Sequence, residues 1–191
     1  MDRITISTDS ETTEMEWVRQ SAENPAAFKP LYERYFKKVF LFVLHRVGDR
    51  DTAGDLTQQV FLSALNHIGR YQFRGLPFSA WLFRIAVNQC NDYFRKAKRS
   101  RTVVIDEVPL ENLYDELTAD QTLDEWQRML PTILEQLPPD ELQVIELRFF
   151  ENRPFKEVAD ILGITETYAK VRTYRILDRM KKLFLKRNKK V

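Results

Sequence analysis

Residues 154–182 read PFKEVADILGITETYAKVRTYRILDRMKK, and this stretch decides the fold of the C-terminal part of the chain. Its pattern predicts a short helix, a tight turn at Gly163 and a longer basic helix. That order is typical of a helix-turn-helix, whose second helix can lie in the major groove of DNA. The stretch therefore indicates a protein that binds nucleic acid.

The second helix of this pair has two chemically different faces. Alternating spacings of four and three residues predict one inward stripe, formed by Ala169, Thr173, Ile176, Met180 and Leu183. The candidates for contacts with phosphates and base edges lie nearer the start of the helix, and they are Lys170, Val171, Arg172, Tyr174 and Arg175. The alternative is a solvated basic helix on an ordinary helical bundle, and the turn pattern around Gly163 argues against it.

Charge is distributed unevenly along the chain, although the formal net charge is only +2. Lys and Arg dominate residues 70–101 and again residues 166–191. Residues 102–127 between them contain many acids and neither Lys nor Arg. Two basic blocks divided by an acidic segment predict two separate contacts with a polyanion.

Composition limits the class of protein further. Only 5 glycines and long segments of period 3.6 predict an all-α protein, and 191 residues suffice for one large or two small domains. Cys90 is the single cysteine, which excludes a disulfide framework within the chain and fits a reducing compartment. The chain has no signal-peptide pattern and no apolar run near the roughly 20 residues that span a bilayer. We expect a cytoplasmic protein without membrane insertion.

The sequence gives no sign of catalysis. His45 and His67 belong to separate predicted helices, and no phosphate-binding loop, nucleophile elbow or zinc-protease motif is present. We therefore predict that the protein is not an enzyme and needs no metal or other cofactor.

The predicted architecture is two small helical domains, residues 25–99 and 122–191, the second containing the helix-turn-helix. The acidic segment at residues 100–121 is predicted to be an extended or mobile linker. Residues 1–24 are predicted to be a tail, frayed to about residue 12, followed by a short helix. The other expected helices cover about residues 25–47, 49–68, 78–98, 122–136, 140–150, 155–162 and 165–186. Pro30 leaves open a start of the first of these one turn later.

Several motifs in fixed order resemble those of bacterial sigma factors of the extracytoplasmic-function group. They are DLTQQVFL at residues 55–62, FRG at 73–75, WLFRIAVN at 81–88, LPPDELQVIELR at 137–148 and FKEVA at 155–159. The resemblance implies a factor that binds core RNA polymerase, recognises the −35 and −10 promoter elements and promotes DNA melting. It also implies a monomer when free and control by an anti-sigma protein.

The resemblance implies that one face of the helix at residues 49–68 binds core polymerase. The side chains assigned to this contact are Asp55, Leu56, Gln58, Gln59 and Leu62. Gly54 and Gln59 stand where the family usually has acids, which predicts a weaker attraction to the basic clamp of the polymerase.

Contacts with the −10 element are assigned to the loop after this helix and to the helix that follows. In the loop Tyr71, Phe73 and Arg74 would hold an unpaired base by stacking and by backbone neutralisation. The alternative is that Phe73, Phe78 and Trp81 fill the domain core. On the following helix the candidates are Asn88, Asp92, Arg95 and Arg99. An ion pair between Asp92 and a neighbouring base is an equally open reading.

The resemblance places the −35 contacts on Arg148 and on the outward residues Lys170 to Arg175 of the last helix. A rival hypothesis is a stand-alone helix-turn-helix regulator with a helical dimerisation domain. That protein would form a stable dimer and bind an inverted repeat tightly without polymerase.

Overall fold

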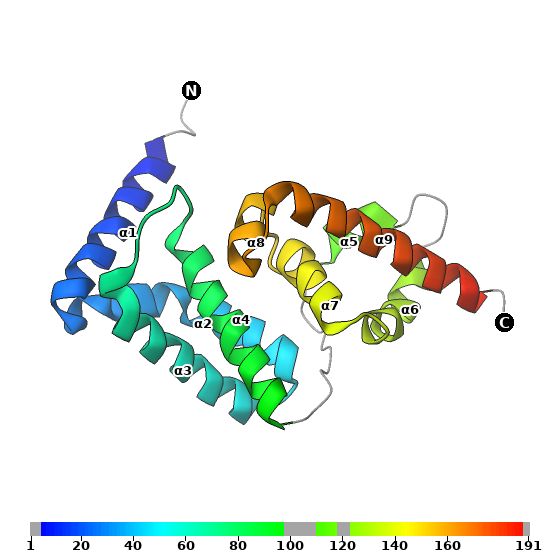
Figure 1. The fold of residues 1–191 in the computed structure, drawn as a ribbon, viewed down its shortest axis with the longest axis horizontal. Coiled ribbons are helices and arrows are strands. Elements are labelled where there is room, and N and C mark those ends of the chain that lie inside the picture. The colour runs from blue at the N-terminus through cyan, green and yellow to red at the C-terminus, as the bar shows by residue number, and fades with distance from the viewer. Residues whose placement is uncertain (1–4, 98–109, 118–122, 189–191) are drawn as a thin grey trace. The chain divides into compact units, whose positions relative to one another are not determined.

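The computed structural model describes residues 5–97, 110–117 and 123–188, with side chains placed between residues 13 and 186 (Figure 1). Every regular element in these ranges is a helix, so the prediction of an all-α fold is confirmed. The chain divides into two compact units, residues 1–99 and residues 100–191.

Between residues 5 and 97 the N-terminal unit contains four α-helices and two short 3₁₀ turns. In chain order they are α1 (Thr5–Glu23), η1 (Pro25–Phe28), α2 (Lys29–Val47), α3 (Arg50–His67), η2 (Ile68–Arg70) and α4 (Phe78–Ala97). The helices α2, α3 and α4 pack on one another, as Figure 1 shows. Their shared core contains the fully buried side chains Leu31, Val39, Val60, Leu82 and Phe83.

The junction between α2 and α3 has a clear local cause. Gly48 adopts the left-handed conformation (φ 72°) that favours glycine, and its N–H donates to the Leu44 carbonyl at 2.8 Å. Asp49 then caps α3, because its side chain accepts a hydrogen bond from the Thr52 N–H at 2.8 Å. These two adjacent residues end one helix and start the next.

Helix α1 begins well before the predicted position. The frayed segment predicted up to residue 12 is helical from Thr5 onward, so that prediction is wrong for residues 5–12. The segment from Thr5 to Glu23 contains neither Gly nor Pro to interrupt a helix. Its C-terminal part is anchored, since Glu14, Val18 and Ser21 are buried and α1 packs against η1, η2 and α2.

The C-terminal unit contains five α-helices and a π-helical turn in its described part. They are α5 (Glu111–Leu117), α6 (Leu123–Glu135), α7 (Pro139–Ile145), the turn η3 (Glu146–Phe150), α8 (Phe155–Leu162) and α9 (Glu166–Asn188). Trp126 stacks on Phe184 with ring centroids 4.2 Å apart, which joins α6 to α9 at the centre of this core.

Helix α5 corrects the prediction of an extended linker. Leu110, Leu113 and Leu117 are spaced three and four residues apart, and all three are buried in the core of the C-terminal unit. Asn112 also donates a hydrogen bond of 3.0 Å to the Asn152 side chain in the turn before α8. Residues 110–117 therefore belong to the C-terminal unit, while residues 100–109 and 118–121 of the predicted linker lie outside the described residues.

Helices α8 and α9 form the helix-turn-helix, and its turn lies between them. Gly163 takes a left-handed conformation (φ 68°), and the Ile164 N–H reaches back to the Ala159 carbonyl at 3.0 Å. The Thr165 hydroxyl then accepts a hydrogen bond from the Tyr168 N–H at 3.2 Å and starts α9. The turn is thus closed from both sides by local hydrogen bonds.

Candidate nucleic-acid interface

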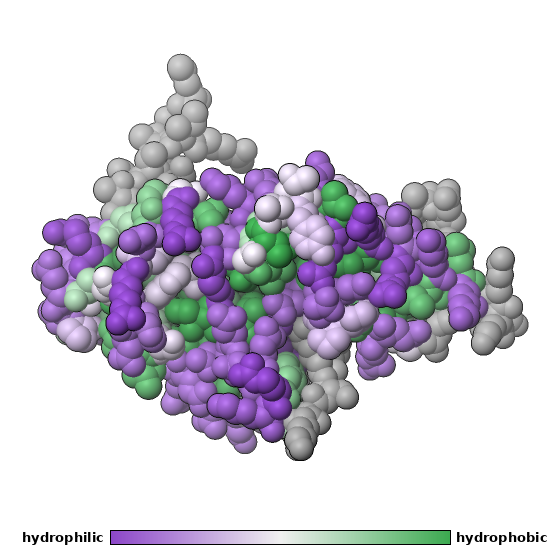
Figure 2. All heavy atoms as spheres, viewed as in Figure 1, coloured by the Kyte–Doolittle hydropathy of each residue, from purple (hydrophilic) through white to green (hydrophobic). Residues whose placement is uncertain are grey.

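The predicted recognition helix presents the expected two faces. Of its predicted inward stripe, Ala169, Thr173, Ile176 and Met180 are buried and Leu183 is partly buried. The opposite face is open: Val171 and Tyr174 are 42% and 44% exposed, and Lys170 and Arg175 are also exposed. Figure 2 shows mostly hydrophilic side chains along α9 on the face in view. The start of α9 therefore offers cations, an aromatic ring and a methyl-bearing side chain to a ligand.

Two other predicted −35 residues lie in more restrained positions. The Arg148 guanidinium lies 5.0 Å from the Phe155 ring centroid and donates to the Arg153 carbonyl at 3.2 Å. Arg172 forms an ion pair with Asp140 at the start of α7. Both cations are partly buried, so these contacts fix their positions before any ligand arrives.

A second ion pair between α7 and α9 was not predicted from the sequence. Arg179 holds both carboxylate oxygens of Glu141, at 2.9 and 2.8 Å. Asp140 and Glu141 are neighbours at the start of α7, so the two ion pairs hold α9 against α7 at two places. The sequence shows the acidic pair in the first turn of α7, but only the tertiary structure shows its partners.

The aromatic side chains in the loop predicted to hold an unpaired base, and at the start of α4, differ in how far they are exposed. Tyr71 packs at 5.6 Å from Phe78 and 5.2 Å from Trp81, both measured between ring centroids. Phe78 is fully buried and Trp81 is partly buried, so the core-filling alternative holds for Phe78 and in part for Trp81. Phe73, in contrast, is 58% exposed. Of the loop aromatics, Phe73 is thus free to stack on a ligand.

Three of the residues predicted to contact the −10 strand lie on one face of α4. Asn88 and Arg95 are exposed and Asp92 is partly buried. Arg95 pairs with Asp92 at 2.8 Å, which is the ion pair that the sequence left open. Arg99, the fourth predicted residue, lies outside the described residues.

The predicted polymerase face on α3 needs one correction. Asp55, Gln58, Gln59 and Leu62 are exposed, and Leu62 is 59% accessible. Leu56 is only 5% exposed, because it lies on the inner stripe of α3 together with Val60 and Ala64. It therefore supports this face from inside and offers little surface to a partner.

Two hollows flank the α3 face. One of about 760 Å³ lies between α2 and α3 and includes Phe36, Phe40, Gly54, Asp55 and Gln58 in its lining. Another of about 370 Å³ lies between α3 and α4. The second hollow brings Gln59 of the predicted polymerase face beside Asp92 of the predicted DNA face.

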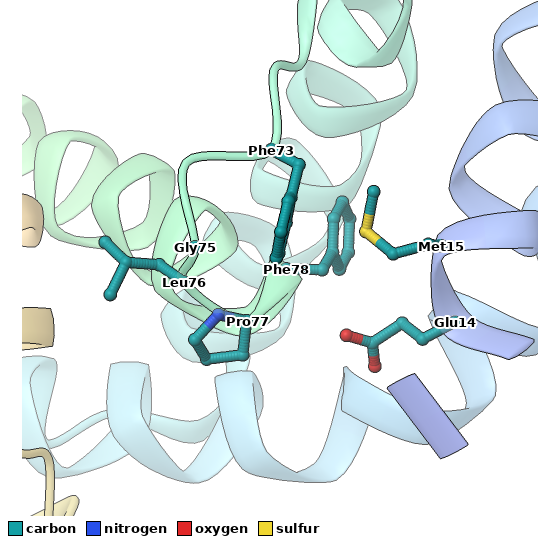
Figure 3. Close-up of a pocket in the computed structure, with 7 residues that line it drawn as sticks. All are labelled: Glu14, Met15, Phe73, Gly75, Leu76, Pro77 and Phe78. Carbon is teal, nitrogen blue, oxygen red and sulfur yellow. The ribbon is translucent and has the colours of Figure 1, made fainter. Parts of the chain in front are cut away.

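A third hollow, of about 390 Å³, lies beside the loop after η2 (Figure 3). Glu14 and Met15 of α1 line it together with Phe73, Gly75, Leu76, Pro77 and Phe78. The two α1 residues were not predicted from the sequence, because nothing in the local pattern shows which loop a helix end will meet.

In the part of the chain that the structure describes, no group of three or more His, Cys, Asp or Glu side chains lies close enough to hold a metal ion. Among the described helices, none combines the length and the apolar character needed to cross a membrane.

Two family models match the chain, one in each compact unit. Sigma-70 region 2 matches residues 31–100, and Sigma-70, region 4, matches residues 133–182. The first match includes α2, α3 and α4, and the second includes the helix-turn-helix. Helices α1 and α5 lie outside both matches.

Similar sequences belong to sigma factors of several bacteria. The chain is 31% identical to ECF RNA polymerase sigma factor BldN of Streptomyces coelicolor, over 86% of this chain and 63% of BldN. The chain thus spans less than two thirds of BldN. It is 30% identical to RNA polymerase sigma factor CarQ of Myxococcus xanthus, over 88% of this chain and 94% of CarQ. It is 28% identical to ECF RNA polymerase sigma factor SigM of Bacillus subtilis, covering 81% and 93% respectively.

Solved structures share the fold. CnrH, in a complex with the cytosolic domain of CnrY, matches with a TM-score of 0.61 and 20% identity, over 89% of this chain and 96% of that one. The sigma factor RpoE of Bartonella quintana, in a complex with the anti-sigma factor NepR, matches with a TM-score of 0.57 and 23% identity, over 83% and 96%. These two structures share the fold, while the sequence relatives and the two matching models establish that the chain belongs to the extracytoplasmic-function sigma factors of bacterial RNA polymerase.

Proposed function

We propose that this protein is an alternative sigma factor that binds core RNA polymerase, recognises the −35 and −10 promoter elements and promotes DNA melting. The observation that supports the proposal is the presence of two units that match sigma regions 2 and 4 in that order. The second unit has an exposed basic face on α9, and the first has the exposed Phe73 in the loop before α4. The factor performs no chemistry itself, since the polymerase makes the RNA. It acts in the cytoplasm, where polymerase and promoter meet.

The C-terminal unit reads the −35 element through the start of α9. Arg175 and Lys170 are exposed cations that reach phosphates. An Arg can also donate two hydrogen bonds to the O6 and N7 atoms of a guanine. Val171 and Tyr174 supply apolar contacts with the groove. Arg148 and Arg172 are held by protein partners, so we assign them to orienting the helix and to phosphate contacts at its edge.

The N-terminal unit holds the melted −10 strand. Phe73 offers an exposed ring on which a base can stack, worth roughly 1–3 kcal/mol for each base. Arg74 is exposed beside it and neutralises the backbone. Asn88 and Arg95 continue a polar path along α4, with Asp92 holding the Arg95 side chain. Arg99, which lies outside the described residues, is assigned to a phosphate contact.

The exposed residues of α3 bind the polymerase clamp. Asp55, Gln58 and Gln59 give a carboxylate and two amides for a basic partner, and Leu62 gives an apolar contact. When free, the factor is a monomer. An anti-sigma protein that covers the DNA-binding and polymerase-binding residues would keep it inactive, by analogy with the complex of RpoE and the anti-sigma factor NepR.

Reconstitution with core polymerase tests the proposal. The purified protein is mixed with core enzyme and with a library of fork-junction promoters, and specific transcripts and gel-filtration profiles are recorded. We expect co-elution with core polymerase and transcripts from a defined promoter class. A stable dimer that binds an inverted repeat tightly, never co-elutes and yields no transcript would establish the rival regulator.

A further inference from the structure

The turn between η3 and α8 contains a residue in an unusual backbone conformation. Among the described residues other than glycine, Asn152 alone has a positive φ, of 53°. Asparagine tolerates this left-handed conformation better than most residues do, yet it persists only where neighbouring contacts maintain it. On one side the Glu151 N–H donates to the Glu146 carbonyl at 2.9 Å. On the other the Arg153 N–H donates to the Leu147 carbonyl at 3.0 Å. The path of the chain through this turn therefore depends on what contacts Asn152.

Helix α5 supplies a contact to Asn152 from 40 residues earlier in the chain. The Asn112 Nδ2 donates a hydrogen bond of 3.0 Å to the Asn152 Oδ1, and both side chains are exposed. The backbone around Asn112 is anchored, because Leu110, Leu113 and Leu117 are buried in the core of the C-terminal unit. The core thus holds Asn112 in place, and Asn112 in turn holds the tip of the turn.

The same turn presents a group that orients Arg148. The Arg153 carbonyl, one residue beyond Asn152, accepts a hydrogen bond from the Arg148 Nη1 at 3.2 Å. The guanidinium also lies 5.0 Å from the ring centroid of Phe155, which keeps it near the start of α8. The direction of a carbonyl follows the backbone torsions beside it. A shift at Asn152 therefore moves the acceptor that directs Arg148.

We propose that Asn112 is a positioning residue for binding of the −35 element. Its hydrogen bond to Asn152 fixes the turn and the Arg153 carbonyl, and this carbonyl holds the Arg148 guanidinium in one orientation, ready for a phosphate of the DNA. A donor held in this way loses less side-chain entropy when it binds. The inference rests on the proposed function, since it needs Arg148 at the promoter duplex. It gives α5, which lies outside the match to region 4, a part in DNA binding.

A double-mutant cycle tests this coupling with the holoenzyme and a promoter that carries the −35 duplex. We expect Arg148→Ala to weaken binding about tenfold, because it removes a charge-assisted contact with a phosphate. Asn112→Ala should weaken binding about threefold, which is the effect of one lost side-chain hydrogen bond. In the Arg148→Ala background the loss from Asn112→Ala should fall below about 1.3-fold, because the residue through which Asn112 acts is gone. A general structural effect of Asn112→Ala would persist in that background.

Further variants show whether the hydrogen bond itself matters. Asn152→Gly removes the acceptor but favours a positive φ, so backbone strain does not explain a loss in this variant. It should weaken binding about threefold, and adding Asn112→Ala should bring no further loss. Gln136→Ala is the matched control, since it removes an exposed, uncharged amide and its hydrogen bond of 2.9 Å to the Thr132 carbonyl in the same unit. It should leave binding unchanged.

The free full-length protein supplies a readout that needs no DNA. NMR of the Arg148 guanidinium should show slower rotation of its Nη groups in the wild type than in Asn112→Ala. Thermal unfolding checks that the variant is folded. Ala is a better helix former than Asn, so a weakened α5 would not explain faster rotation or weaker binding.

The outcomes separate the two proposals. A loss from Asn112→Ala that is as large in the Arg148→Ala background as in the wild type would overturn the role of Asn112 and leave the proposed function intact. Unchanged binding of Asn112→Ala or of Arg148→Ala, or equal guanidinium rotation in the two free proteins, would do the same. Failure of the wild type to bind core polymerase or the promoter would overturn both.

Discussion

Four cations of the C-terminal unit differ in how far the protein itself restrains them. Arg148 and Arg172 are partly buried and bonded to protein groups, whereas Lys170 and Arg175 are exposed on α9. A restrained cation loses less side-chain entropy on meeting a phosphate, and a free one adapts more easily to a base. The residues most suited to reading sequence are therefore those that the fold leaves free.

Replacing Arg175 by Ala tests the reading of the −35 element. We expect Arg175→Ala to weaken holoenzyme binding to the upstream duplex by roughly 1–3 kcal/mol if the side chain contacts a base. Lys182→Ala, farther along the exposed side of α9, is the control for a general loss of charge. Footprinting on promoters altered at single −35 positions gives the measurement, and an unchanged footprint would remove Arg175 from the site.

Gly54 is a helix residue that the fold does not require to be glycine. A Cβ atom built at this position meets nothing within 4 Å, and its φ lies outside the left-handed region. Gly54→Ala should therefore raise the free energy of unfolding by about 1 kcal/mol through helix propensity. Urea unfolding followed by circular dichroism measures this; a loss of stability would show that a nearby group needs the space.

At the scale of elements, α5 is a structural part of the C-terminal unit. Leu113 is fully buried in a core that also contains Trp126 and Phe184. Leu113→Ala should destabilise this unit by about 2–5 kcal/mol, because it removes buried methyl groups and leaves a cavity. Hydrogen exchange of the full chain locates the effect. The exposed Glu116→Ala on the same helix should change little.

Helix α1 contains a carboxyl group whose titration can be followed. Hydrogen bonds from Arg19 and from Gln20 lower the pKa of Glu16 to about 2. Because the pKa of Glu16 is lowered in the folded state, its carboxylate stabilises the fold at pH values above the ordinary pKa of 4.5. This stabilisation is lost as the pH falls toward about 2. Because the pair is exposed, the effect on stability is small. An NMR titration should place the midpoint near 2 and return it toward 4.5 in Arg19→Ala.

At the scale of the whole molecule, the residues proposed to bind the −35 and −10 elements lie in separate compact units. Substitutions at distant sites without shared partners usually add within roughly 0.5 kcal/mol. We expect the losses from Arg175→Ala and Phe73→Ala on a full fork promoter to be additive within that margin. Filter binding with the two single variants and the double variant measures this, and a coupling well above it would show that the units act as one.

Much of the fold could be read from local patterns. The turn at Gly163, the cap at Asp49 and the stripe from Ala169 to Met180 depend on neighbours within a few residues, and all were predicted. Helix α5 was missed because Leu110 and the two leucines of the helix lie in an acidic segment, where composition outweighed spacing. The early start of α1 was missed because no cap signal marks it.

The sequence by itself determined the helical class, the two basic blocks, the helix-turn-helix and the order of motifs, because each depends on residue type and short-range periodicity. Only the tertiary structure decided that Leu56 faces inward, that Phe73 stays exposed while Phe78 is buried, and that Asp140 and Glu141 hold α9. Only the tertiary structure also brought Glu14 of α1 beside a loop some sixty residues away. Contacts between distant segments depend on how whole helices pack, and no local pattern of side chains encodes that packing.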